Sequence, residues 1–290
     1  MVKGMKFAVG NDISVKGLPM TAGHKILEGY IAPFDASAVK ALRDAGAQLV
    51  EGGEADFEIL SDAGGELRLA AAKKGMVGLK PTYGAVSRYG LFAYASSFEV
   101  IGVVGKSAAD VGKVFEVIRG YDEKDVTTTK NTPPPARPSK FLEGNINKDV
   151  KLETIDSWEA VWQILSSAEA ATNLARYDGL KYGLSMQGGD LDAVCKNTRT
   201  AGFDDRTKEQ IMLGNYVLSG DNYQKLFVKA AKVRTLIIED FTKAFEKVDI
   251  IVTPAERKYM IGANIAGLPA IVRDGVHLIG RPFEEGALLK

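Results

Sequence analysis

The sequence is poor in the residues from which disulfide frameworks and zinc sites are built. Its 290 residues include one cysteine, Cys195, and two histidines, His24 and His277. A single thiol cannot form an internal disulfide, and two histidines far apart in the sequence do not supply a conventional zinc site. We therefore expect no metal and no other cofactor.

Excess charge of one sign and long apolar runs are also missing. The chain has 37 Lys and Arg residues against 37 Asp and Glu residues, so no net positive field is available to hold a phosphate backbone. The weakly polar run at 91–104 contains Glu99 and is too short to span a bilayer, and the N-terminus, MVKGMKFAVGNDI, has no signal-like apolar core. These absences predict a cytoplasmic or organelle-matrix protein with no direct nucleic-acid ligand and no membrane role.

What is present is an alternation of β-like and helical patterns. Apolar spacing and capping residues predict helices over 35–48, 107–119, 157–175, 205–218 and 223–248, and strands over 7–13, near 49, and over 249–254 and 275–280. Ser107 is the expected N-cap of the second helix, with Asp110 at its third position. Such alternation favours an α/β fold over a sandwich or a bundle.

A proline-rich stretch divides the chain. Residues 127–138 read TTTKNTPPPARP and include four prolines, which lack a backbone donor and favour extended conformations. This composition predicts a surface linker within 127–150.

Seven segments, in order and over nearly the whole chain, carry a resemblance to a known family. They are FAVGNDISVKGLPMTAGHKILEGYIAPFDA, SDAGGELR, GMVGLKPTYGAVSRYGLFAYASS, EAATNLARYDGLKYG, IMLGNYVLSG, KVRTLIIEDFTKAFEKVDIIVTP, and ANIAGLPAI with IGRPFEE. Together they resemble the amidase-signature enzymes, most of all the A subunit of the glutamyl/aspartyl-tRNA amidotransferase. The resemblance implies one domain over 1–290, with a mixed β-sheet core flanked by helices and reduced by several deletions. It also allows 127–150 to be a trimmed insertion.

The catalytic positions of the family are not kept. The resemblance implies a nucleophilic serine, a bridging serine and a lysine base that together form an acyl-enzyme from an amide. In this sequence Gly10 stands at the position of the lysine and Glu66 at that of the nucleophile, and the loop of the bridging serine is shortened between 50 and 61. We therefore predict no catalytic residues, with Gly10 and Glu66 as degenerate family positions.

A relict pocket remains a possibility, formed by Gly64, Gly65, Arg88 and Tyr182. The two glycines can be read as oxyanion donors or as turn residues, and the turn reading is favoured because no nucleophile stands beside them. Lys80 can be read as a base of lowered pKa, but we expect it to pair with a carboxylate or to reach the surface.

Three functions follow as hypotheses. The first is a catalytically inactive scaffold that docks amidotransferase-like partner subunits or a catalytic paralogue, or that associates with itself. The second is a residual glutamine or amide hydrolase that uses Lys80, Glu66 or Glu99 in a rearranged site. The third is a regulator that binds an amide or amino acid without turnover. Trp158, Trp162 and the 223–248 helix are candidate docking elements, although core packing is their more common use.

Overall fold

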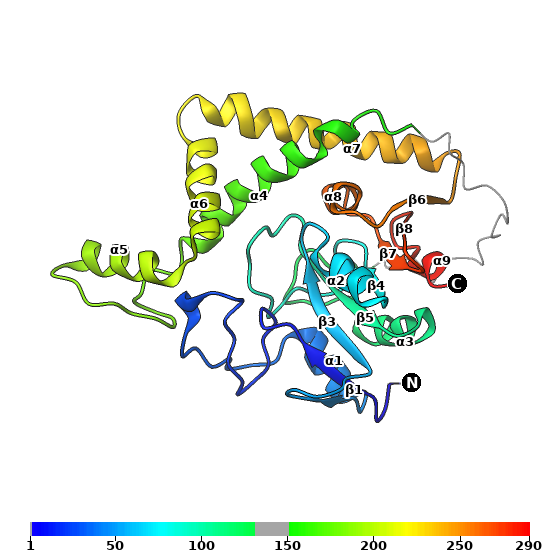
Figure 1. Ribbon diagram of the computed structural model, residues 1–290, viewed down its shortest axis with the longest axis horizontal. Helices are drawn as coiled ribbons and strands as arrows, with labels where there is room; N and C mark the ends of the chain where they lie inside the picture. The colour runs from blue at the N-terminus through cyan, green and yellow to red at the C-terminus, as the bar shows by residue number, and fades with distance from the viewer. Residues whose placement is uncertain (1, 131–150) are drawn as a thin grey trace.

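The strands form one mixed sheet in the computed structural model, which describes residues 2–130 and 151–290 (Figure 1). Within these ranges the sheet has eight strands in the order β2-β1-β3-β5-β4-β7-β8-β6. β1 runs parallel to β2 and β3, and the other neighbours are antiparallel. The bounds are β1 (Lys6–Val9), β2 (Gln48–Leu49), β3 (Phe57–Asp62), β4 (Val77–Lys80), β5 (Val100–Gly105), β6 (Ile250–Pro254), β7 (Ala270–Arg273) and β8 (Val276–Gly280). The predicted α/β class with a mixed sheet is confirmed.

Helices cover the sheet and extend beyond it. Their bounds are α1 (Ser37–Asp44), α2 (Glu66–Lys74), α3 (Ala108–Ile118), α4 (Trp158–Leu174), α5 (Leu191–Gly202), α6 (Asp205–Leu218), α7 (Lys229–Phe245), α8 (Arg257–Ile265) and α9 (Glu285–Leu288). Short 3-10 turns occupy Lys25–Leu27 (η1) and Ile155–Ser157 (η2), and a π-helical segment, Tyr223–Val228 (η3), leads into α7. Figure 1 shows α5 and α6 lying away from the sheet.

The two faces of the sheet pack against different helices because strand side chains alternate in direction. Val103 on β5 belongs to the core shared with α1 and α3, whereas its neighbour Val104 packs with Leu67 and Ala71 of α2. A further core joins α4, α7 and α8 to the sheet near β6 and β8. The helix α2, which follows β3 directly, is thereby fixed on the sheet face opposite α1 and α3.

The close approach of α2 depends on glycines in the strands below it. A Cβ atom on Gly78 of β4 would lie 2.5 Å from Cβ of Ala71, and one on Gly102 of β5 would lie 2.7 Å from Cδ1 of Leu67. No side chain fits in either space. Gly78 thus has a structural role, and the N-terminus of α2 is held against the sheet.

The tryptophans of α4 are core residues. Trp158 is 1% exposed and Trp162 is 9% exposed, and the ring of Trp158 stacks on Phe241 of α7 with centroids 5.4 Å apart. The core reading of both tryptophans is confirmed, and the docking reading of these two residues is wrong.

Element boundaries differ from the sequence predictions in places. The first strand ends at Val9 rather than at residue 13, and Ile13 forms only an isolated bridge with Leu91. The helix predicted over 35–48 spans Ser37–Asp44, because Gly46 adopts a left-handed φ of 83° and turns the chain into β2. The expected cap is confirmed, since Oγ of Ser107 accepts a hydrogen bond from the N–H of Asp110 at 3.1 Å. Most of the predicted linker, 131–150, lies outside the described residues.

A buried ion pair joins several elements beneath the sheet edge. Asp62 at the end of β3 and Arg68 on α2 are both 0% exposed, and Nε of Arg68 lies 3.0 Å from Oδ2 of Asp62. Arg68 also donates to the Met260 carbonyl at 3.1 Å and to Oδ1 of Asn264, both on α8. Burial raises the pKa of Asp62, but the attraction of Arg68 outweighs it and holds this pKa below its ordinary value.

His277 of β8 completes this cluster in its neutral form. Nη1 of Arg68 donates to Nε2 of His277 at 2.8 Å, so the proton is on Nδ1, which donates to Oγ1 of Thr253 on β6 at 2.9 Å. Burial and the Arg68 charge keep the pKa of His277 well below its ordinary value.

Lys80 lies in the same buried region. It is 0% exposed, and its Nζ donates to the Pro81 carbonyl at 2.9 Å. Burial, with repulsion from Arg68, lowers the pKa of Lys80 to about 7. The expectation that Lys80 pairs with a carboxylate or reaches the surface is wrong, because among the described residues no carboxylate lies within ion-pair distance of it.

Replacing one partner of the buried pair should destabilise the fold strongly. Arg68→Met leaves the Asp62 charge buried without a cation, and we expect a loss of about 3–5 kcal/mol in the free energy of unfolding, measured by urea titration. The matched control is Arg43→Met, which removes a surface pair with Asp35 and should cost at most about 1 kcal/mol. Equal losses in the two variants would contradict the structural role of the cluster.

Removing Lys80 should change how stability depends on pH. Its pKa is about 7 in the folded chain and 10.5 when unperturbed, so the unfolded state binds more protons between these values and this contribution to stability rises with pH. Lys80→Met should lose that rise, seen as a flatter curve of unfolding free energy from pH 7 to 10.5 than in the parent. The control Lys73→Met, on the exposed side of α2, should keep the parent's slope of unfolding free energy against pH. An unchanged slope in Lys80→Met would contradict the lowered pKa of the buried Lys80 amine.

Candidate active site

A cavity lies where the carboxyl ends of β1 and β3 meet the N-terminus of α2. The two strands are parallel neighbours, so the residues that follow them emerge at the same edge of the sheet. The cavity has a volume of about 250 Å³ and is lined by Gly10, Asp12, Ser61 and Glu66, among others. It therefore brings together Gly10 and Glu66, the two positions to which the sequence resemblance drew attention.

Gly10 contributes no charge to this cavity. Its N–H donates to the Ile59 carbonyl at 2.9 Å, which continues the β1–β3 pairing by one residue. A Cβ atom built on Gly10 would lie 2.7 Å from Oδ1 of Asp12. A longer side chain at this position therefore requires the Asp12 carboxylate to move, and the site has adapted to a glycine.

The Glu66 carboxylate is folded back on the loop that precedes it. Its Oε2 accepts hydrogen bonds from the N–H of Ala63 at 3.0 Å and of Gly64 at 2.7 Å. Glu66 is also the first residue of α2, where the helix dipole favours negative charge. These donors are the kind that stabilise a developing oxyanion when they are free, but here a side chain of the chain itself occupies them.

The two glycines of this loop are needed for its shape. Gly65 has a φ of 102°, and a Cβ atom on it would lie 2.8 Å from Cβ of Met260. A Cβ on Gly64 would lie 2.8 Å from the ring of Trp162, whose Nε1 donates to the Ala63 carbonyl at 2.9 Å. The contacts support the turn reading of Gly64 and Gly65.

Ser61 and Asp12 form a pair that the sequence reasoning missed. Oγ of Ser61 donates to Oδ2 of Asp12 at the wall of the cavity. Burial raises the pKa of Asp12, and the Ser61 hydrogen bond offsets this only in part. Asp12 lies in the segment VGNDI and Ser61 in SDAGGE. Because the two residues are 49 positions apart, no local sequence pattern predicts that they meet.

The other predicted pocket residues lie elsewhere. Arg88 lines a different cavity, with Glu99, and does not line the one that contains Gly10 and Glu66. Tyr182 is 42% exposed and meets the rings of Tyr30 and Tyr177 edge-on, with centroids 6.2 and 5.9 Å away. The structure does not bring Arg88 and Tyr182 together with Gly64 and Gly65.

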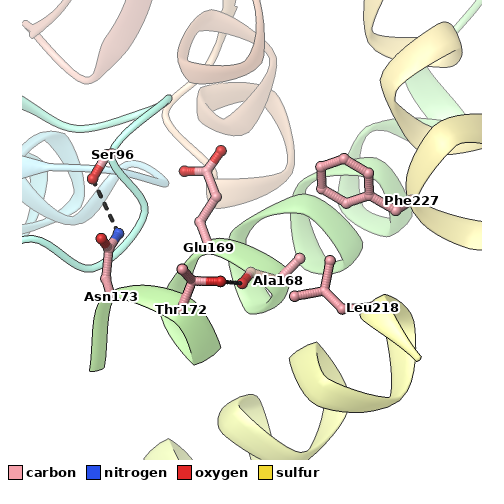
Figure 2. A pocket seen from close by; sticks show the side chains of 7 residues that line it. All are labelled: Ser96, Ala168, Glu169, Thr172, Asn173, Leu218 and Phe227. Carbon is pink, nitrogen blue, oxygen red and sulfur yellow. Dashed lines mark hydrogen bonds between the residues drawn. The ribbon is translucent and has the colours of Figure 1, made fainter. Parts of the chain in front are cut away.

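A third cavity, of about 240 Å³, lies between α4, the end of α6, η3 and the loop at Ser96 (Figure 2). Its polar groups are engaged within the chain: Nδ2 of Asn173 donates to Oγ of Ser96 at 3.0 Å, and Oε2 of Glu169 accepts from the N–H of Ser97 at 2.8 Å. Leu218 and Phe227 complete an apolar wall on the other side.

Metal ligands and membrane-spanning helices are both missing from the described part of the chain. In 2–130 and 151–290, no group of three or more His, Cys, Asp or Glu side chains is placed to hold a metal ion. None of the helices described there combines the length and the apolar character needed to cross a bilayer.

Comparison with known proteins identifies the fold and the relatives. The Amidase family model matches residues 1–53, 47–147 and 142–266. The A subunit of glutamyl-tRNA(Gln) amidotransferase from Symbiobacterium thermophilum is 32% identical, with 99% of this chain and 81% of the relative covered. The corresponding protein from Methanosarcina barkeri is 33% identical, with coverage of 99% and 83%. The alignment with the first relative runs over 395 residues, although this chain has 290, so the relative contains internal segments that are missing here.

A solved structure agrees with the sequence relatives. The crystal structure of the glutamyl-tRNA(Gln) amidotransferase A subunit from Thermotoga maritima matches with a TM-score of 0.73 at 26% identity, covering 99% of this chain and 82% of that one. With the match to the family model and the two relatives above 30% identity, this places the chain in the amidase-signature family, with close similarity to the A subunit of glutamyl-tRNA(Gln) amidotransferase.

Proposed function

We propose that this chain is a catalytically inactive relative of the amidotransferase A subunit that acts in the cytoplasm and docks partner proteins in an amidotransferase-like assembly. The observation that carries the proposal is the Glu66 carboxylate, which occupies the N–H groups of Ala63 and Gly64; the resemblance implies that Glu66 stands where the family has its nucleophile. The names of the relatives describe one subunit of a larger enzyme. This supports the proposal that the chain binds other protein subunits.

The cavity lacks the lysine base and the free oxyanion donors on which the amide-cleaving chemistry implied by the resemblance depends. A serine nucleophile needs a neighbouring base and donors for the oxyanion. Gly10 supplies no base, and Glu66 blocks the donors with a negative charge that would also repel the developing oxyanion. Binding of an amide carbonyl at this loop would first require the Glu66 side chain to leave.

The alternative, a residual hydrolase, has less support. Lys80 is buried with its Nζ on the Pro81 carbonyl, and Glu99 lines another cavity, so neither lines the cavity of Glu66. The Ser61–Asp12 pair is the arrangement in this cavity that such an activity would have to use. It lacks free oxyanion donors for the same reason as above.

Exposed apolar side chains on α6 favour a docking role. Met212 is 71% exposed and Tyr216, one turn further along, is 59% exposed. Tyr223 at the start of η3 is 41% exposed, and Figure 1 shows α6 away from the sheet. Large apolar and aromatic side chains of this kind are enriched in protein interfaces. We name Met212, Tyr216 and Tyr223 the α6 surface.

Ammonia release tests the loss of chemistry. The purified chain, alone or mixed with amidotransferase partner subunits, should release no ammonia from glutamine or asparagine above a buffer blank, because the family's lysine base and free oxyanion donors are both lacking. Glu66→Ser alone should also stay inactive, since Gly10 still provides no base. Release that persists after repeated purification and disappears in Ser61→Ala would overturn the inactive assignment and favour the residual hydrolase.

Charge placed on the α6 surface should weaken partner binding. We expect the Met212→Glu, Tyr216→Glu double variant to bind the B and C subunits of the amidotransferase at least about tenfold more weakly than the parent, measured by surface plasmon resonance. Val126→Glu, at a site 96% exposed outside α6, is the matched control and should bind like the parent. Equal binding by the double variant, or no binding by the parent, would contradict docking through this surface.

A further inference from the structure

The cavity that contains Arg88 has charged walls of both signs. It has a volume of about 210 Å³, below the size of drug-binding pockets. Its walls combine two cations, two carboxyl groups and two small apolar side chains, namely Arg88, Lys124, Glu99, Asp125, Leu91 and Ala93. It does not share a lining residue with the cavity of Glu66, so a ligand here would be independent of the proposed loss of amidase chemistry.

The carboxyl group of Glu99 is buried and only half satisfied. The residue is 4% exposed, and its Oε1 accepts hydrogen bonds from the N–H of Tyr94 at 2.6 Å and from the N–H of Ala95. No hydrogen bond reaches Oε2 from any residue of the described chain. Oε2 is therefore left for a group bound in the cavity that Glu99 lines.

Arg88 lines the same cavity, and its ion pair there is a loose one. Its Nη1 donates to the Ser96 carbonyl, while Nε lies 3.5 Å from Oδ2 of Asp125 and makes no hydrogen bond. Although Arg88 and Glu99 line one cavity, they form no ion pair with each other in the part of the chain described. The gap between them is therefore open to a third group.

Lys124 adds a second cation at the rim. Its Nζ lies 4.7 Å from the centroid of the Tyr89 ring, and within the described ranges no carboxylate pairs with it. By contrast, Asp125 is already engaged, since it accepts from the N–H of Arg88 at 2.8 Å and from Oγ1 of Thr127 at 2.7 Å. Lys124 and Glu99 are thus the cation and the carboxyl group of this cavity without a charged partner in the described chain, whereas Arg88 is paired with Asp125.

We infer that this cavity binds a small zwitterion, an α-amino acid with an uncharged side chain, whose carboxylate lies between Arg88 and Lys124 and whose ammonium group meets Oε2 of Glu99. A ligand with one charge would meet only the cations or only Glu99, so it would gain fewer charge-assisted hydrogen bonds than a zwitterion. The small volume selects for a free amino acid over a peptide.

Isothermal titration calorimetry at pH 8 tests this with defined probes. Glycine, alanine, serine, asparagine and glutamine carry both charges, whereas glycinamide lacks the carboxylate and N-acetylglycine lacks the ammonium group. At least one of the five amino acids should saturate the chain below about 10 mM, and the two single-charge analogues should bind at least about tenfold more weakly than glycine or not at all. Absence of saturation by all five amino acids would overturn the inference.

Variants locate the binding. Glu99→Gln keeps the Oε1 acceptor but removes the negative charge, and Lys124→Met removes a rim cation; each should weaken binding at least about tenfold. Lys113→Met on α3, an exposed lysine outside the cavity, should bind like the parent. If Glu99→Gln fails to fold, as judged by circular dichroism, Lys124→Met and the cavity-filling Ala93→Leu carry the test.

The competing cavity gives a distinct result. Binding that survives Glu99→Gln, Lys124→Met and Ala93→Leu but is lost in Asp12→Asn would place the amino acid beside Glu66 and overturn this inference. That outcome would support the non-hydrolysing amino-acid regulator, and it would leave the absence of ammonia release unaffected. Binding lost in the first three variants and kept in Asp12→Asn is the result expected here.

Discussion

The buried pair between Asp62 and Arg68 is the interaction on which the rest of the structure depends. It joins the end of β3 to α2, reaches α8 through Asn264 and β8 through His277, and is entirely shielded from water. Asp62 also accepts a hydrogen bond from the N–H of Gly65 at 2.8 Å. Removal of either charge would leave the other buried without its partner, at a high cost in stability. Because Asp62 also holds Gly65, the pair fixes the loop before α2 independently of any chemistry there.

This constraint explains how a family framework persists around an altered site. The positions that hold the loop, among them Gly64, Gly65 and Trp162, are packed to within contact distance and tolerate little change. Gly10 and Glu66 line the cavity, where the nearest atoms belong to side chains such as that of Asp12. Glu66 satisfies the loop's own N–H groups, and this stabilises the start of α2.

Local patterns predicted part of this arrangement. The Ser107 cap and the helix over 205–218 were predictable because their signals lie within one helix. The helix α2 was not predicted, because the apolar residues of its sequence ELRLAAAKK are spread around the helix and form no apolar stripe. The pairing of Arg68 with His277 spans 209 residues, so only the folded chain reveals it. Sequence spacing likewise could not predict that Arg88 and Tyr182 lie apart from Gly64 in the folded chain.

The measurement that tests the central claim most directly is amide hydrogen exchange at Ala63 and Gly64, followed by NMR in the parent and in Glu66→Ala. If the Glu66 carboxylate occupies these donors, both amides should exchange at least about tenfold more slowly in the parent than in the variant, while the Gly65 amide, held by Asp62, stays protected in both. Equal exchange of Ala63 and Gly64 in the two proteins would show that the donors are free, and would contradict the account of the inactive site.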